Sequence, residues 1–175
     1  ITPLKSPPPN LTSLFDFGLA GPLLGFAASL AFFVEGLSMT ASLDFDQVSE
    51  FPVLPTYLLR TSALGGGLIE FILGKGAVMQ NAAAGAVLPL HPFAITGFVG
   101  ILTNALALLP IGNTDGGRIS VAMFGRRGSY IVKSFTTAIL CAAGLFGLDG
   151  AGVLLTYVLF AMIWQREMEA PARNE

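Results

Sequence analysis

The sequence predicts an all-α integral membrane protein with about four transmembrane helices plus one re-entrant or interfacial helical segment. Hydrophobic residues make up 53% of the 175 residues and charged residues only 11%, whereas soluble domains carry about 25% charged residues. The mean hydropathy is +0.72. Several apolar runs approach or exceed the roughly 20 residues that a helix needs to cross a bilayer.

The remaining composition excludes several classes of protein. The net charge of −2 gives no indication of nucleic-acid binding, and we expect membrane lipids and other membrane subunits as partners. The single cysteine, Cys141, excludes an internal disulfide framework and a cysteine-based metal cluster. It lies in an apolar run, where a cysteine packs as a small hydrophobic residue.

The chain divides into an extended arm at 1–17, one helical membrane domain at 18–165 and a polar tail at 166–175. The arm is proline-rich and lacks an initiator methionine, so we expect either a processed product or part of a longer chain. The first span is predicted at 17–41, with Pro22 in a first helical turn. Gly21 and its neighbouring glycines Gly18 and Gly25 allow close helix contact.

The segment 55–73 is apolar but is interrupted by Arg60, Glu70 and three consecutive glycines. A clean span does not usually break in this way, so a re-entrant or interfacial helix pair is predicted. Arg60 and Glu70 either reach the interface or pair with another subunit.

Three further apolar runs follow, at 86–110, 130–148 and 151–164. In the first, Gly97 and Gly100 suit close packing of helices. The last run has 14 residues, which is short for an independent crossing. Four of the nine basic residues fall within 118–133, which predicts a basic loop on the side that is not translocated.

The stretch from Leu108 to Arg118 carries the strongest indication of function. An apolar run ends at Pro110, and Asp115 then lies in a glycine-rich turn with Gly116 and Gly117. An ionisable residue at membrane depth is costly and is by default a functional candidate. The alternative is a polar loop in which Asp115 caps the next helix, because Asp-Gly-Gly is also common in turns.

This stretch, Leu-Leu-Pro-x-Gly-x-x-Asp-Gly-Gly, resembles the second signature of the site-2 protease family of intramembrane zinc metalloproteases. The similarity is to the chloroplast branch named for ethylene-dependent gravitropism-deficient and yellow-green proteins, and Leu19 to Pro22 resembles the Ala-Gly-Pro segment of that branch. The resemblance implies that Asp115 corresponds to the third zinc ligand. The chain departs from the family at Ala107, where an asparagine is usual, and at Thr114, where leucine is common.

Catalysis by such a protease requires His-Glu-x-x-His on one helix, which supplies two zinc ligands and a general base. This sequence has no such motif and only one histidine, His91. A His-Pro pair at this position also resembles the chloroplast branch. His91 is either a magnesium ligand of chlorophyll, a polar neighbour of an active site, or an interfacial histidine bonded to a carbonyl freed by Pro92.

Two functions of different class follow. The first is a non-catalytic, site-2-protease-like subunit with a structural or binding role in a chloroplast membrane, thylakoid or envelope, associated with a photosynthetic complex. The second is the C-terminal part of an active zinc protease whose His-Glu-x-x-His helix lies upstream, with zinc on Asp115. Chlorophyll or lipid at helix surfaces is compatible with either, and the resemblance implies that 118–133 faces the stroma. A pigment-binding antenna protein is less favoured, because its paired glutamate–histidine patterns are missing.

Overall fold

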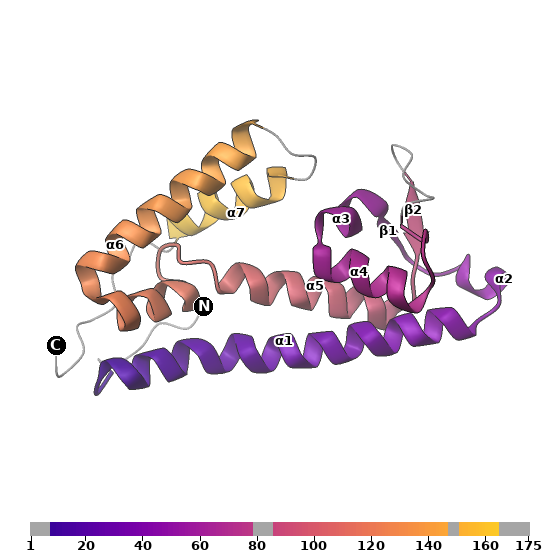
Figure 1. The fold of residues 1–175 in the computed structure, drawn as a ribbon, viewed down its shortest axis with the longest axis horizontal. Coiled ribbons are helices and arrows are strands. Elements are labelled where there is room, and N and C mark those ends of the chain that lie inside the picture. Colours follow the sequence, from indigo (N-terminus) through magenta and orange to yellow (C-terminus); the bar gives the residue numbers. More distant parts are fainter. Residues whose placement is uncertain (1–7, 79–85, 147–150, 165–175) are drawn as a thin grey trace. The chain divides into compact units, whose positions relative to one another are not determined.

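The computed structural model describes residues 8–78, 86–146 and 151–164, and these are mainly helical (Figure 1). The helices are α1 (Leu11–Ser42), α2 (Phe45–Val48), α3 (Thr56–Thr61), α4 (Ala63–Ile72), α5 (Pro92–Ala107), α6 (Asp115–Phe146) and α7 (Ala151–Trp164). Two short strands, β1 (Val53–Pro55) and β2 (Val87–Pro89), complete the described elements.

The helical class is confirmed, with one addition that the sequence analysis missed. Strands β1 and β2 pair antiparallel, with Val53 opposite Pro89 and Leu54 opposite Leu88. Both strands read Val-Leu-Pro. Three residues are too few for an alternating pattern to show. The two strands are also far apart in the sequence, so no local pattern indicated that they pair.

Among the described residues, two helices are long and apolar enough to cross a membrane, α1 and α6. Helices α4 and α5 and the segment Leu154–Trp164 of α7 are apolar but shorter. The membrane class is therefore supported, while the count of four transmembrane helices stays a prediction.

Helix α1 begins earlier than predicted, so the extended arm proposed for 1–17 is wrong from Leu11 onward. Asn10 explains the early start, because its Oδ1 accepts a hydrogen bond from the Ser13 amide at 2.7 Å, as an N-cap does. Pro22 accordingly lies inside the helix and not in its first turn. Proline in a helix interior removes one backbone hydrogen bond, a defect that membrane helices tolerate. Residues 1–7 and the tail at 166–175 lie outside the described residues.

The helix pair predicted within 55–73 is present as α3 and α4, although the break is at Ser62 and not at the triple glycine. The Ser62 hydroxyl caps α4 by accepting from the Gly65 amide at 3.0 Å. Gly65 packs on Phe98, since a Cβ there would approach the ring to 2.6 Å. Packing against Phe98 therefore accounts for a glycine at position 65, whereas a Cβ on Gly67 would meet nothing within 4 Å.

The basic loop predicted at 118–133 is wrong, because this segment belongs to α6. The helix is interrupted only at Gly125, where φ is 65° and ψ is −179°. This is a conformation that essentially only glycine adopts. The clustered basic residues were taken as a loop signal, whereas they lie on helix and only Gly125 marks a break between two helical halves.

The chain forms two compact units, Gly25–Leu102 and a unit that combines Ile1–Leu24 with Thr103–Glu175. Helices α1 and α5 run from one unit into the other, so the single membrane domain predicted at 18–165 remains a prediction.

The unit Gly25–Leu102 has its core where α1 crosses α5, around Phe33, Leu37, Ala94 and Phe98. A Cβ at Gly97 would collide with the backbone of Phe33, and one at Gly100 with the Ser29 side chain. The predicted close packing at these two glycines is therefore confirmed.

In the other unit, α7 packs along α6 (Figure 1) around Ile111, Val158 and Ala161. Cys141 lies half-buried against this cluster as a free thiol, as expected for a small hydrophobic residue.

Candidate functional site

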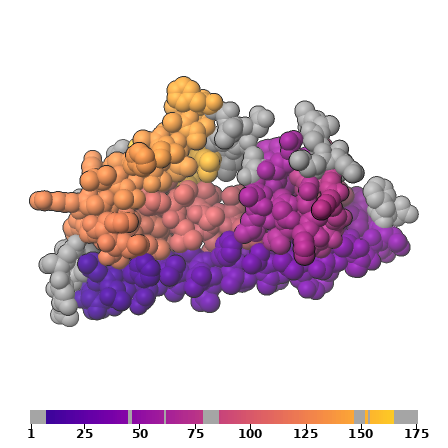
Figure 2. Space-filling view, in the orientation of Figure 1, coloured from indigo at the N-terminus to yellow at the C-terminus, as the bar shows by residue number. Residues whose placement is uncertain are grey.

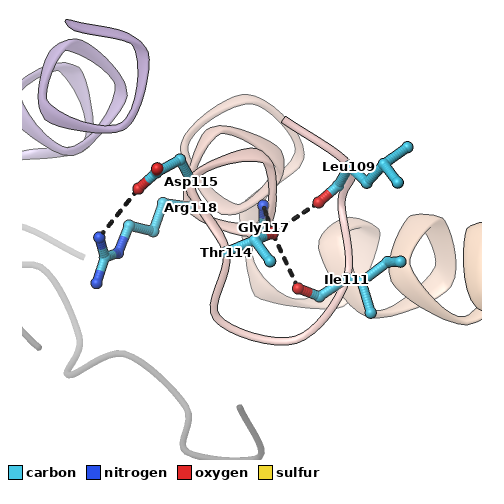
Figure 3. A network of polar contacts seen from close by, with 6 residues as sticks. All are labelled: Leu109, Ile111, Thr114, Asp115, Gly117 and Arg118. Carbon is cyan, nitrogen blue, oxygen red and sulfur yellow. Dashed lines mark hydrogen bonds and ion pairs between the residues drawn. The ribbon is translucent and has the colours of Figure 1, made fainter. Parts of the chain in front are cut away.

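The candidate site is the turn that joins α5 to α6, and Thr114 organises it (Figure 3). Its hydroxyl lies 2.6 Å from the carbonyl oxygen of Leu109 and 2.9 Å from that of Ile111, so one proton is shared between two acceptors. The same oxygen accepts from the Gly117 amide at 3.0 Å. Thr114 is therefore the N-cap of α6, and the alternative in which Asp115 caps this helix is wrong.

Gly116 and Gly117 allow the turn to close against the end of α5. A Cβ at Gly116 would collide with the carbonyl of Leu108, and a Cβ at Gly117 would press on the carbonyl of Gly112. Both glycines are buried. The structural importance predicted for this pair thus has a direct cause, which is backbone approaching backbone with no room for a side chain.

Asp115 occupies the first position of α6, where a negative charge interacts favourably with the helix dipole. Its Oδ1 lies 3.2 Å from Nη1 of Arg118, and the two side chains point toward each other in Figure 3. The Asp115 side chain is 31% exposed and that of Arg118 only 2%. Asp115 is therefore the charge partner of a buried guanidinium.

Residues of α1 enclose this ion pair. The guanidinium carbon of Arg118 lies 5.4 Å from the centroid of the Phe17 ring, a cation–π distance. A Cβ at Gly18 would come within 3.2 Å of the Asp115 carbonyl oxygen. Gly18 is thus the glycine at which this part of α1 packs closely against the start of α6. No described atom lies within 4 Å of a Cβ placed on Gly21.

The residues present do not by themselves fit a zinc ion. A catalytic zinc needs three protein ligands, and no group of three His, Cys, Asp or Glu residues occurs within the described ranges. Asp115 is a possible ligand, but the adjacent Arg118 charge competes with a cation for its carboxylate. The whole sequence supplies only one histidine.

That histidine, His91, lies at the start of α5 in the unit Gly25–Leu102. Its Nδ1 accepts from the Phe93 amide at 3.2 Å, and its ring packs edge-on against Phe51 and Phe93. Nδ1 of the imidazole is thus occupied as an acceptor, and in the neutral ring the proton then lies on Nε2. The backbone group that His91 binds is an amide and not the carbonyl expected from Pro92. Pigment binding by His91 remains a prediction that nothing here tests.

Three site residues escaped the sequence analysis. Thr114 appeared only as a departure from the family, although a threonine before Asp-Gly-Gly is itself an N-cap signal. Arg118 was counted as a loop residue, although its spacing of three from Asp115 predicts pairing on a helix. The Tyr157 hydroxyl of α7 donates to the Leu106 carbonyl at 2.7 Å, and a lone tyrosine in an apolar run gave no indication of that contact.

Comparison with known proteins identifies the family of the chain that carries the Asp115-Gly116-Gly117 motif. The sequence model of peptidase family M50 matches residues 4–149. The chain belongs to peptidase family M50. It is 32% identical over 172 residues to the probable zinc metallopeptidase EGY3, chloroplastic, of Arabidopsis thaliana, covering 95% of this chain and 29% of that protein. It is also 32% identical to the probable zinc metalloprotease EGY1, chloroplastic, of the same plant, covering 100% of this chain and 30% of that protein.

A further relative is the DDT domain-containing protein PTM of Arabidopsis thaliana, 34% identical over 126 residues, which are 72% of this chain and 7% of that protein. No solved structure matches the chain. The M50 chain described here thus spans less than a third of the length of these relatives. The chloroplastic homologues and the two long apolar helices fit a chloroplast membrane.

Proposed function

We propose that this chain acts as a non-catalytic M50 module, with a structural or binding role in a chloroplast membrane. The observation that carries the proposal is the pairing of Asp115 with Arg118, whose side chain is only 2% exposed. A buried guanidinium needs a compensating charge. Asp115 supplies that charge, so the residue at the position of the family's metal ligand has a structural task in this chain.

The histidine supports the same proposal. His91 is engaged as a helix cap through Nδ1, and the chain contains no second imidazole to form a metal site with it. The similarity to PTM is compatible with this proposal, since a segment 34% identical over 126 residues lies in a protein named for its DDT domain.

The test is a metal count on the full-length protein purified from its native membrane. We expect zinc well below one ion per chain, and no change in zinc content on Asp115→Asn substitution. Asp16→Asn is the matched control, because Asp16 is an exposed acid on α1. One zinc per chain that is lost in Asp115→Asn and kept in Asp16→Asn would overturn the proposal.

A second candidate, the C-terminal part of an active intramembrane zinc protease, is favoured by one observation. The 3.2 Å contact between Arg118 and Asp115 uses Oδ1 of the carboxylate, and the Asp115 side chain is 31% exposed, so the carboxylate is within reach of a further ligand. An upstream helix bearing His-Glu-x-x-His would restore the missing ligands. Sequencing the native N-terminus and assaying cleavage of a transmembrane substrate distinguishes this candidate from the first.

We also place the subunit in the thylakoid membrane, bound to a photosynthetic complex, with the basic 118–133 segment toward the stroma. Support comes from Glu70 on α4, whose Oε1 is buried without a hydrogen-bond partner among the described residues, and from the exposed Arg60 on α3. Both are charges that a neighbouring subunit would complete. Co-migration with a photosynthetic complex on native gels of thylakoids, absent from envelope fractions, is the expected result.

A further inference from the structure

The break in α6 folds the two halves of this helix against each other. Gly125 has φ 65° and ψ −179°, so the helix axis changes direction there (Figure 1). The Cε of Lys133 lies 3.3 Å from the position of a Cβ on Gly117, whereas in a straight helix the two residues would stand about 24 Å apart, at 1.5 Å per residue. Figure 2 shows the atoms of α6, in orange, gathered in one mass on this face. We call the contact between residues 115–124 and 126–133 the α6 seam.

Each half of the helix places a serine in the α6 seam. Ser120 follows Gly117 by three residues, and Ser129 precedes Lys133 by four. Residues three or four apart share one face of a helix, so each serine lies on the face that makes the Gly117–Lys133 contact. The side chains are well buried, with Ser120 3% exposed and Ser129 1% exposed. Both hydroxyls therefore lie inside the seam, between that contact and the break.

Neither hydroxyl is bonded in the way that is usual for a serine on a helix. Ser29 and Thr40 on α1 donate to the carbonyl oxygen four residues earlier, at 2.7 Å and 2.8 Å, which is the common local bond. The Oγ atoms of the two seam serines are buried and have no hydrogen-bond partner among the described residues. For Ser129, the carbonyl four residues earlier belongs to Gly125, whose ψ turns it out of the helix direction.

Two buried hydroxyls without partners on facing surfaces indicate a small polar ligand, because buried polar groups are almost always hydrogen-bonded. We propose that one water molecule is bound in the α6 seam and is hydrogen-bonded to both Ser120 and Ser129. Water both donates and accepts, as the two hydroxyls do, and a buried water usually bonds two to four polar groups of this kind. An ion would bring a net charge to a pair of neutral groups.

The bound water joins the two halves of α6 and so stabilises the bent form of the helix. This role does not depend on whether the chain is catalytic, because the two serines are separate from the Asp115–Arg118 pair.

The first experiment is SDS titration of the full chain in mixed micelles, with Ser120→Ala and Ser129→Ala measured singly and together. Each single substitution removes a hydrogen bond to the water, so we expect the unfolding equilibrium constant to rise about fivefold. The double variant should unfold about as readily as either single variant, because both substitutions act on the same water. Ser134→Ala, at an exposed serine of the same helix half, is the matched control and corrects for the helix propensity of alanine.

The sign of the effect decides between a bound water and two hydroxyls that lack any partner. Removing a buried hydroxyl that bonds to nothing relieves an unfavourable burial, so single variants more stable than Ser134→Ala would overturn the proposal. Independent losses that add in the double variant would also contradict it.

Two further measurements use the unsubstituted chain and decide even if the variants fail to fold. A crystal structure that resolves ordered waters should show density within about 3.2 Å of both Oγ atoms. A direct bond between the two hydroxyls, or a seam with no such density, would refute the water. Replacing chloride by gluconate in the titration should leave the unfolding equilibrium constant unchanged, and a dependence on chloride would assign the seam to an anion instead.

Discussion

Helices α5 and α6 begin in similar ways, but the candidate functional residues at their starts have different structural roles. Each starts soon after a proline, and each has a residue type that binds metals, His91 at α5 and Asp115 at α6. At α5 the histidine side chain is itself the cap, accepting the Phe93 amide. At α6 the cap is Thr114, so the neighbouring carboxylate is left to pair with Arg118. The residue that caps a helix thus decides whether its neighbour is available for other chemistry.

The close packing of the α6 start is the feature whose loss should cost most. Gly116→Ala places a methyl group against the Leu108 carbonyl, and forcing atoms into a packed site costs about 3 kcal/mol of unfolding free energy. The measurement is SDS titration in mixed micelles followed by circular dichroism. Gly21→Ala, with open space around its Cβ, should be neutral or slightly stabilising. Equal effects of the two substitutions would show that the turn is not packed as described.

The ion pair at α6 should show an asymmetry between its two members. Asp115→Asn leaves the guanidinium of Arg118, only 2% exposed, without its carboxylate, which we expect to cost about 2 kcal/mol. Arg118→Met leaves a carboxylate that water can reach, so the charge imbalance itself should cost less than 1 kcal/mol. Measuring the unfolding free energy of each variant at several salt concentrations separates the effect of the charge imbalance from that of lost packing. A larger salt-dependent loss in Arg118→Met than in Asp115→Asn would contradict the assignment of Asp115 as the compensating charge.

The two helix starts also show what the sequence can and cannot predict. The membrane class, the end of α5 at the Leu108–Pro110 stretch and the packing of Gly97 and Gly100 follow from composition, proline and small-residue spacing, which are local signals. The Gly125 break and the contact of Phe17 with Arg118 could not be predicted, because they depend on which distant segment packs against α6. The resemblance located Asp115, but its pairing with the buried Arg118 is known only from the three-dimensional structure.

The two caps themselves provide the smallest and most direct test of the comparison. Thr114 is 2% exposed and its hydroxyl serves three backbone groups, so Thr114→Val, which keeps the shape and removes the hydroxyl, should cost about 1.5 kcal/mol. His91 is partly exposed and serves one amide, so His91→Ala should cost about 0.5 kcal/mol.

Thr114→Ser and His91→Asn keep a capping oxygen and should recover most of each loss in the same SDS titration. If His91→Ala lowers the unfolding free energy and His91→Asn does not restore it, the imidazole has a role other than capping α5. The start of α5, and not that of α6, would then be the place to look for a ligand.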